Sequence, residues 1–428
     1  MNLWIKNGHV LDPANHLDEV CDVYVKEGKV ACVGSLSSDK IPDECTVIDA
    51  EGKYVMPGLV DLHVHLREPG FEYKETIYSG THAMAKGGFT AVCPMPNTKP
   101  VTDSPAMIEK ILKIAKTDSP IHVYPVGAVT KGQLGEEMTD IAGMVKAGAK
   151  AISEDGKSVM NAEIYRVAMK EAKKAGIPVL AHCEDKNMVG HGAMNAGKKA
   201  KELGICGITN AVEDVIVARD ILLAKETGVH LHLCHCSTKD SVKMVRIAKE
   251  DGVSVSAEVC PHHFAMTEDE IAGDDANYKM NPPLRSAADV EALVDGLADG
   301  TMEAISTDHA PHGEEEKKQS IAKAPFGIVG SETAYALSVT HLVKTGKLTP
   351  LQLVEKMSTN PCRILSVPGG TLSVGAPADI TIADMDSEYV IDKNTFLSKG
   401  KNTPFDGAKV NGRVYYTIVG GNIVYQYE

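Results

Sequence analysis

The sequence lacks long apolar runs and an excess of basic residues. No stretch approaches the roughly 18 consecutive apolar residues that a membrane-spanning helix needs. The 428 residues include 44 Lys and Arg against 58 Asp and Glu, which gives a formal net charge of -14. A nucleic-acid-binding surface needs a basic patch, so this balance argues against one. We therefore expect neither a membrane nor a nucleic acid as a partner, although a few local cations could still bind a small anion.

Paired cysteine motifs and a secretory signal are also missing. The ten cysteines are scattered and form no C-x-x-C pair. The first residues, "MNLWIKNGHV", lack the apolar core and the small-residue cleavage site of a signal peptide. Because disulfides are rare inside cells, we expect reduced thiols in a cytoplasmic protein.

Both ends of the chain are rich in short strands, whereas the middle is not. Residues 22–34 form two alternating runs joined at a Glu-Gly pair, and residues 413–428 form two β-branched and aromatic runs around a Gly-Gly pair. Such pairs between alternating runs predict β-hairpins. We expect the two ends to pair into one small sheet domain, with the middle inserted between them as a separate domain. The expected ranges are 1–56, 366–428 and, for the middle, 57–365.

The middle alternates between strand-like and helical segments, which predicts an α/β fold with parallel strands. The helical segments are residues 104–116, 163–176, 213–228 and 241–252. The strand candidates are residues 58–66, 89–97, 121–129, 149–155, 177–184, 229–235, 253–263 and 302–309. Eight strands of this kind close a (β/α)₈ barrel of the TIM type. A doubly wound open sheet is the alternative.

The stretch "VDLHVHLRE" places polar residues at every second position of an otherwise apolar run. Side chains alternate between the faces of a strand, so His63, His65 and Arg67 share one face. Several later strand candidates also end in residues that can bind metal or move a proton: Glu154, Asp155, His182, His235 and Asp308. In a barrel these ends lie on one face, where active sites are found. We therefore expect these side chains to converge.

This mixture of residues suits a catalytic metal centre. Neutral imidazoles and carboxylates are good zinc ligands, and sites without thiolates are more often catalytic than structural. A further carboxylate can move a proton between water and a leaving nitrogen. A single histidine at a strand end is more often structural, so the prediction depends on several of them occurring together.

Other polar residues and thiols are expected to have no catalytic role. His230 and His232 share one strand face and are interpreted as structural. The thiols beside the candidate ligands are interpreted as packing residues, because alternation places them on the opposite face; they are Cys183, Cys234 and Cys236. The charged residues 313–319, "GEEEKKQ", are expected to form a solvated loop.

Several motifs together resemble the amidohydrolase superfamily and, within it, dihydroorotases of the long bacterial type. They are "PGLVDLHVHLREPG", "PMPNTKPVTD", "SEDGKSV", "LAHCED", "CHCST", "EVCPHH", "MNPPLR", "STDHAPH" and "GAPADITIAD". The resemblance runs through nearly the whole chain. It implies a metal-dependent barrel with a β-sandwich built from both chain ends. It also implies reversible cyclisation of N-carbamoyl-L-aspartate to L-dihydroorotate in pyrimidine synthesis.

The resemblance also implies a role for each motif residue. His63 and His65 would bind a first zinc ion, His182 and His235 a second, and Asp155 would bridge the two. Asp308 would be both a ligand of the first zinc ion and the general acid–base. Arg67, Asn97 and His312 would hold the substrate carboxylate, with His65 also near the substrate. Asn281 and the backbone around Phe326 and Gly327 would contact the ring.

Some alternatives stay open at this point. Many relatives in the superfamily bridge their metals with a carboxylated lysine, and Lys150 precedes the favoured Asp155; Glu154 is expected to be structural. One or two zinc ions are expected, with two favoured. The rival functions are allantoinase, hydantoinase or dihydropyrimidinase, and a non-enzymatic scaffold. We also expect a homodimer and consider an association with aspartate carbamoyltransferase.

Overall fold

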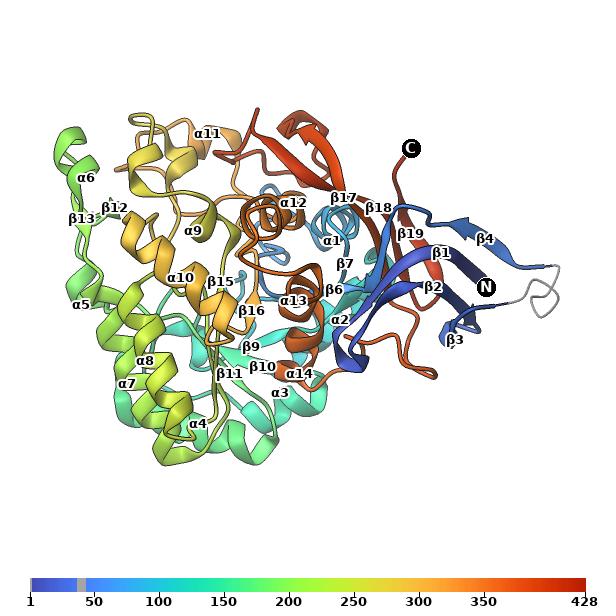
Figure 1. The fold of residues 1–428 in the computed structure, drawn as a ribbon. Helices are drawn as coiled ribbons and strands as arrows, with labels where there is room; N and C mark the ends of the chain where they lie inside the picture. The colour runs from blue at the N-terminus through green and yellow to red at the C-terminus, as the bar shows by residue number, and fades with distance from the viewer. Residues whose placement is uncertain (1, 37–43) are drawn as a thin grey trace.

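A computed structural model describes residues 2–36 and 44–428. Figure 1 shows a barrel with surrounding helices and, to one side, a sheet that contains both ends of the chain. Residue 1 and residues 37–43, which belong to the predicted N-terminal part of the β-sandwich, lie outside the described residues. The predicted domain boundaries at residues 56/57 and 365/366 stay a prediction.

The two ends of the chain form one hydrogen-bonded sheet. Its order is β19-β18-β17-β5-β1-β2-β3, and β4 pairs with β1. The antiparallel pairing of β5 with β17 joins the N-terminal strands to the C-terminal strands. The strands are β1 (Leu3–Asp12), β2 (Leu17–Lys26), β3 (Lys29–Gly34), β4 (Thr46–Asp49), β5 (Tyr54–Pro57), β17 (Ile380–Val390), β18 (Lys409–Val419) and β19 (Asn422–Gln426). Side chains from both ends pack into one core, including Ile5, Val23, Val55, Ile380 and Ile418.

The two predicted hairpins are confirmed. Glu27 and Gly28, between β2 and β3, have φ values of 52° and 76°. Gly420 and Gly421, between β18 and β19, have φ values of 53° and 75°. Two successive residues with positive φ match the right-handed twist of the flanking strands, which explains why glycine occurs at these turns.

The eight predicted strands all occur, and they form a closed parallel barrel. They are β6 (Leu59–Val64), β7 (Phe89–Pro94), β8 (His122–Val123) with β9 (Val126–Ala128), β10 (Ala151–Ser153), β11 (Val179–Ala181), β14 (Leu231–Leu233), β15 (Val255–Val259) and β16 (Ala304–Ile305). The prediction of one continuous third strand is wrong, because β8 and β9 are separated around Pro125, which has no N–H to donate. Val64 pairs in parallel with His309 and closes the barrel.

The helices that cover the barrel follow the predicted rhythm, and the four predicted ones are confirmed as α2, α4, α7 and α8. The helices are α1 (Ile77–Lys86), α2 (Pro105–Asp118), α3 (Ile141–Ala147), α4 (Ala162–Ala175), α7 (Ala211–Thr227), α8 (Lys239–Glu250), α10 (Ala287–Asp299), α12 (Ala334–Ser338), α13 (Pro350–Val354) and α14 (Asn360–Leu365). In α4, Asn161 caps the first turn and Gly176 ends the helix with φ of 72°. Its buried residues recur at helical spacing: Tyr165, Ala168, Met169 and Ala172.

Shorter elements lie in the connections, several of them next to the mouth of the barrel. They are α5 (Lys186–Val189), β12 (Met194–Asn195), α6 (Lys198–Leu203), β13 (Gly207–Ile208), α9 (Pro261–Ala265) and α11 (Glu314–Lys317). The expected solvated loop at residues 313–319 is therefore partly helical.

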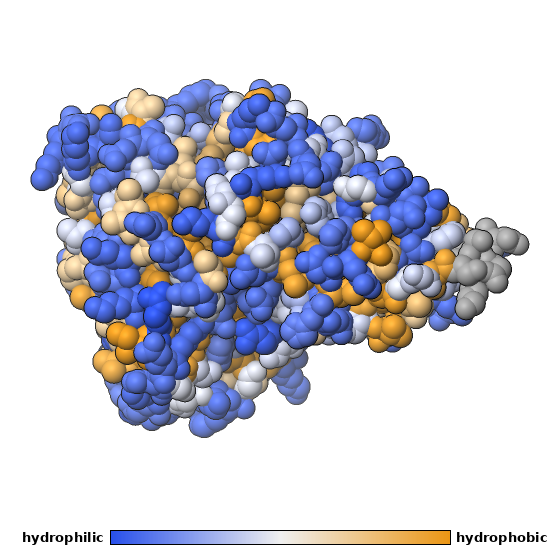
Figure 2. Space-filling view, in the orientation of Figure 1, coloured by the Kyte–Doolittle hydropathy of each residue, from blue (hydrophilic) through white to orange (hydrophobic). Residues whose placement is uncertain are grey.

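The barrel and the sheet share apolar contacts, because Met56, Met385 and Val414 belong to the same buried cluster as barrel residues. Figure 2 shows hydrophilic residues over much of the visible face, with apolar residues in small groups between them. Within the described residues, no helix is both long and apolar enough to cross a membrane.

Candidate active site

The candidate ligands meet at the carboxyl ends of the barrel strands. His63 lies in β6, and the other five candidates lie just beyond the ends of β6, β10, β11, β14 and β16: His65, Asp155, His182, His235 and Asp308. A cavity of about 160 Å³ opens there. It is lined by His65, Arg67, Asn97, Asp155, Gly156, His182, His235, Asn281, Asp308, Ala310, Phe326 and Gly327. Every predicted site residue except His63 and His312 lines this cavity.

Asp155 lies between two pairs of histidines. The first pair is His63 and His65, and the second pair is His182 and His235. Its Oδ1 is 3.1 Å from His63 Nε2, 3.5 Å from His182 Nδ1 and 3.8 Å from His235 Nε2. Its Oδ2 is 3.6 Å from His65 Nε2. Burial alone raises the pKa of the Asp155 carboxyl, but the imidazoles, His63 first, lower it well below its usual value. An ionised carboxylate in this central position has the geometry to contact two cations.

Asp308 lies beside the first pair of histidines. Its Oδ1 is 3.0 Å from His65 Nε2 and 3.6 Å from His63 Nε2. Burial raises the pKa of Asp308, while the hydrogen bond from His65 and the charges of His63 and His65 lower it below its usual range. The Asp308 carboxylate is therefore ionised at neutral pH and able to accept a proton.

The donor set fits divalent metal ions. In the part of the chain that the structure describes, four groups of three have ligand atoms within 4.8 Å of one another, and two of them consist of candidate ligands alone: His63, His65 and Asp308, and His63, Asp155 and His235. A third group places the Cys234 thiol beside His63 and Glu258, although strand alternation predicted that thiol on the opposite face from the candidate ligands. Among the described residues, His63 Nε2 has no hydrogen-bond partner although it is fully buried. Buried polar atoms are normally satisfied, so a buried nitrogen that faces two carboxylates indicates a metal ligand.

Three site residues have strained backbones. Arg67, His235 and Asp308 have φ values of 62°, 32° and 47°. Such left-handed conformations are costly for residues other than glycine and cluster at functional sites. Buried Asp61 helps to hold this region, because it accepts hydrogen bonds from the backbone N–H groups of His63 and Thr307.

Arg67 and His312 form a polar wall at one side of the cavity. Arg67 Nε donates to Pro311 O at 3.1 Å, and its Nη2 lies 3.3 Å from His312 Nε2. His312 Nε2 donates to Phe326 O at 2.7 Å, and Lys74 donates to His312 Nδ1 at 3.2 Å. Burial and the charge of Arg67 lower the pKa of His312 to about 2. His312 is therefore neutral, and Arg67 supplies the positive charge.

Two predicted substrate residues already have partners inside the site. Asn97 joins His65 Nδ1, at 2.9 Å, to Asp155 Oδ2, at 3.1 Å. Asn281 donates to Glu184, a residue that the sequence analysis did not single out. Glu184 follows His182 in "LAHCED", so its place after a strand end was a usable signal. These contacts fix both amides at the cavity wall.

Glu258 of β15 is another functional residue that the sequence analysis missed. It is fully buried, with Oε1 3.3 Å from His63 Nδ1 and Oε2 2.9 Å from His232 Nε2. Ser306 also donates to Oε2. A carboxylate beside the outer nitrogen of a ligating histidine fixes the ring and its tautomer. The signal was a single acidic residue within the apolar strand "VSAEV".

Lys150, the alternative metal bridge, and the residues that we interpreted as structural lie outside the lining of this cavity. Lys150 precedes β10 and so lies at the opposite end of the strand from Asp155. Glu154 accepts hydrogen bonds from the backbone of Val129 and Thr130 and so ties β9 to β10. The thiols of Cys183, Cys234 and Cys236 are buried, and burial raises the pKa of each.

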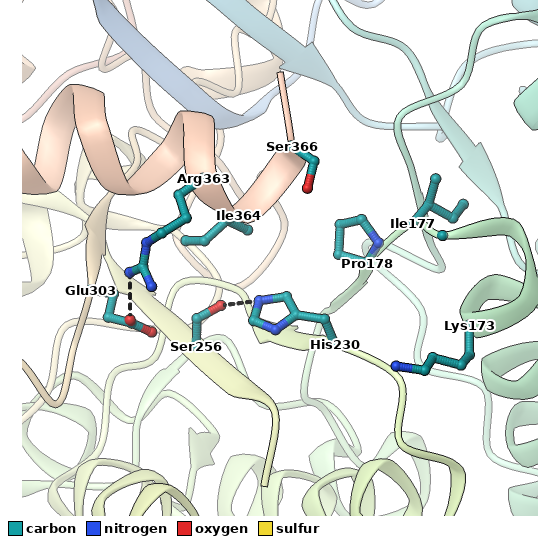
Figure 3. A pocket seen from close by; sticks show the side chains of 10 residues that line it. Lys173, Ile177, Pro178, His230, Ser256, Glu303, Arg363, Ile364 and Ser366 are labelled. Atoms are coloured by element: carbon teal, nitrogen blue, oxygen red, sulfur yellow. Dashed lines mark hydrogen bonds and ion pairs between the residues drawn. The ribbon is translucent and has the colours of Figure 1, made fainter. Parts of the chain in front are cut away.

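A second cavity, of about 360 Å³, lies at the amino ends of the same strands (Figure 3). His230 lies there between two serine hydroxyls, each 2.9 Å from a ring nitrogen: Ser254 and Ser256. Arg363 pairs with Glu303 at 2.8 Å. His230 is thus part of a local polar network, and it lies at the other end of the barrel from the candidate ligands.

Comparison with known proteins identifies the family. A family described as Dihydro-orotase-like matches residues 52–241. A dihydroorotase from Pelotomaculum thermopropionicum is 51% identical over 426 residues, which cover 100% of this chain and 99% of that relative. A dihydroorotase from Acetivibrio thermocellus is 47% identical over 420 residues, 98% of each chain.

The chain belongs to the dihydroorotase family. This confirms the resemblance inferred from the motifs. A solved structure of L-hydantoinase (dihydropyrimidinase) from Arthrobacter aurescens has a TM-score of 0.87 and 28% identity, covering 99% of this chain and 96% of that one. The predicted fold class is also confirmed. For a member of the dihydroorotase family, the grouping of six ligand-type side chains, five of which line one cavity, suits a metal-dependent cyclic amide hydrolase.

Proposed function

We propose that this chain is a zinc-dependent dihydroorotase that catalyses the reversible cyclisation of N-carbamoyl-L-aspartate to L-dihydroorotate in pyrimidine biosynthesis. The observation that carries the proposal is the grouping of six ligand-type side chains, five of which line a cavity of about 160 Å³ together with the cation of Arg67. A cavity of this size suits a single small ring with its carboxylate.

In this proposal, His63, His65 and Asp308 would hold one zinc ion, His182 and His235 would hold a second, and Asp155 would be a ligand that the two share. The position of Asp155 between the two histidine pairs supports two ions over one. Bound zinc supplies Lewis acidity and lowers the pKa of water. Glu258 keeps the His63 ring oriented so that Nε2 faces the two aspartates.

Asp308 moves the proton. During hydrolysis, the oxygen of water bonds to the ring carbonyl carbon, and the bond from that carbon to the ring nitrogen breaks. The ionised Asp308 carboxylate takes the proton from the water and delivers it to the departing nitrogen. The second proton of the water, carried by the new carboxyl group, passes to Asp308 at the end of hydrolysis. In the direction of cyclisation Asp308 therefore starts protonated: it returns this proton to the substrate carboxyl group, takes the proton of the attacking nitrogen and delivers it to the departing oxygen, which leaves as water.

Arg67, Asn97 and His312 hold the substrate carboxylate, and Asn281 and the backbone of Phe326 and Gly327 contact the ring. Arginine suits the first role because its planar group can meet a carboxylate through two parallel hydrogen bonds. The His65 side chain lies between the metal group and Asn97, so it is near the substrate as well.

The rival functions differ in whether the substrate has a carboxylate that a cationic side chain must bind. Allantoinases and hydantoinases act on rings without a substrate carboxylate for Arg67 to bind, so Arg67 at the cavity favours dihydroorotate. A non-enzymatic scaffold would be expected to lose ligands, whereas all six candidate ligands are present and converge.

The test is a substrate panel on purified, zinc-loaded protein with dihydroorotate, allantoin, hydantoin and dihydrouracil. A chelator control accompanies each substrate. We expect turnover of dihydroorotate alone and its loss on chelation. Turnover of an uncharged ring instead would be consistent with the metal centre in the barrel but would reject dihydroorotate as the substrate. No chelator-sensitive turnover of any ring would favour the scaffold.

We also propose that the protein is a cytoplasmic homodimer. An association with aspartate carbamoyltransferase would place it beside the enzyme class that supplies carbamoyl-aspartate. Sedimentation of the purified chain tests the homodimer, and sedimentation of the chain mixed with aspartate carbamoyltransferase tests the association. A single monomeric species in both samples would contradict them.

A further inference from the structure

Lys317 is a buried lysine within the most charged segment of the chain. The sequence "GEEEKKQ" predicted a solvated loop, and Glu314, Glu315 and Lys318 are indeed exposed. Lys317, at the end of α11, is only 7% exposed, so for this residue the prediction is wrong. Lysines are almost never buried unless their amino group has partners, which makes those partners informative.

The amino group of Lys317 donates to three backbone carbonyls. They belong to Gly327 at 2.9 Å, Pro325 at 3.1 Å and Lys279 at 3.2 Å. An ammonium group has three N–H bonds, so three carbonyls satisfy it fully. Burial lowers the pKa of Lys317 to about 7, whereas three carbonyl acceptors favour the protonated form.

These carbonyls lie on the two chain segments that form one wall of the cavity. Phe326 and Gly327 line the cavity from one segment, and Asn281, two residues after Lys279, lines it from the other. The Gly327 N–H also donates to Lys279 O at 3.0 Å. Lys317 itself does not line the cavity, so it can affect the site only through these backbone groups.

The backbone at Gly327 has little freedom to adjust. Its φ is +132°, and a Cβ there would lie 2.7 Å from the Ala310 Cβ. Asn402 provides a second support, since its Nδ2 donates to Gly327 O at 3.0 Å. Its Oδ1 accepts a hydrogen bond from the His312 N–H at 3.1 Å. The wall is therefore held from behind by two polar side chains.

We propose that Lys317 is a positioning residue that fixes the Phe326–Gly327 backbone against the segment of Lys279 and Asn281, and so sets the shape of the subsite for the substrate ring. The inference rests on the proposed function, because it specifies how the site recognises its ring. In this proposal the position of the Phe326–Gly327 wall depends on Lys317 together with Asn402.

The first test compares Lys317→Met with Lys318→Met. Met keeps the length of the side chain and removes its donors, and Lys318 is the adjacent, exposed lysine that pairs with Glu314 and Glu315. For Lys317→Met we expect the KM for dihydroorotate to rise about 10- to 100-fold with kcat and zinc content little changed. Lys318→Met should behave as the unmodified enzyme. A KM within about twofold of the unmodified value in Lys317→Met would overturn the proposal.

A structural role alone would lower the thermal stability without splitting KM from kcat, and that outcome also contradicts the proposal. If Lys317→Met does not fold, Lys317→Arg takes its place, because it keeps the charge but has a different donor geometry. We then expect an intermediate KM. An unchanged KM in Lys317→Arg, with Lys317→Met unfolded, would likewise reject the positioning role.

Limited trypsin digestion separates this inference from the proposed function. Lys323 is an exposed cleavage site within the same segment. Loss of the Lys317 contacts should speed cleavage after Lys323 in Lys317→Met but not in Lys318→Met, whatever the substrate is. If the unmodified protein does not turn over dihydroorotate, the proposed function fails, and the cleavage rates still decide whether Lys317 holds the wall.

Discussion

The two ends of the barrel differ in how their buried polar atoms are satisfied. At the amino end, both ring nitrogens of His230 contact serine hydroxyls, and Glu303 pairs with Arg363 and Lys249. At the carboxyl end, within the part of the chain that the structure describes, nitrogens of His63, His182 and His235 have no hydrogen-bond partner. At the amino end both nitrogens of the His230 ring therefore have partners, whereas at the carboxyl end His63 Nε2 lies beside Asp155 and Asp308 without a hydrogen bond to any described residue.

The difference shows that cavity size is a poor guide to function. The amino-end cavity, at about 360 Å³, is larger than the carboxyl-end cavity, at about 160 Å³. Only the smaller one brings several histidines and two ionised carboxylates together. It is also lined by three non-glycine residues with positive φ, Arg67, His235 and Asp308, whereas the amino-end cavity is lined by one, Ser366. Convergence of donors, together with several strained residues, therefore makes the carboxyl end the candidate reactive end.

The largest effect that separates the two ends is expected for Asp308→Asn. This change keeps a side-chain oxygen but removes the proton-accepting carboxylate. Turnover should fall about 10³-fold in both directions, the scale of lost general acid–base catalysis. Steady-state rates and zinc content by mass spectrometry measure the effect. Full activity with zinc retained would reject the proposed proton transfer.

Arg67→Met should have the next largest effect. It removes the cation for the substrate carboxylate and touches none of the candidate metal ligands. The KM for dihydroorotate should rise about 10- to 100-fold, with zinc content unchanged. Arg67→Lys is the matched control and should recover part of the affinity. An unchanged KM in Arg67→Met would show that the carboxylate binds elsewhere.

Glu258→Gln tests the difference between the two barrel ends by its effect on zinc affinity. The substitution leaves the outer nitrogen of His63 without its anionic partner, so zinc affinity should fall about 10-fold. Competition with a chromogenic chelator measures this affinity directly. Glu303→Gln, which alters a carboxylate at the amino end, is the control and should bind zinc as the unmodified protein does.

His230→Ala should have the smallest effect and tests the amino end. Turnover should stay within about twofold, while the unfolding free energy falls by about 1 kcal/mol because two hydrogen bonds to serines are lost. Denaturant unfolding and steady-state kinetics measure the two quantities. A loss of turnover as large as that of Arg67→Met would break the distinction between the two ends.

Much of the fold could be predicted because periodicity is a local property. Apolar runs that alternate with helical segments identified all eight barrel strands. The hairpins at residues 27–28 and 420–421 followed from the residue types at the turns. The interruption of the third strand was missed, although Pro125 is visible in the sequence, because the apolar run continues across it. Grouping of the ligands followed from the rule that parallel strands end on one face.

The supporting residues could not be predicted in the same way. Glu258 matters because it meets His63 and His232 from other strands, and Glu184 because it meets Asn281 from another loop. Asparagine is common in turns, so the sequence left the role of Asn97 open. Only its contacts with His65 and Asp155 show where its amide lies.

The sequence by itself determined the strand and helix order, and it predicted the end of the barrel at which the candidate ligands meet and their residue types. Each of these depends on spacing along the chain. Only the tertiary structure decided that Lys317 is buried while its neighbours are exposed, because the carbonyls of Gly327, Pro325 and Lys279 come together only after folding. The free energy of burying a charge depends on partners that no local pattern encodes.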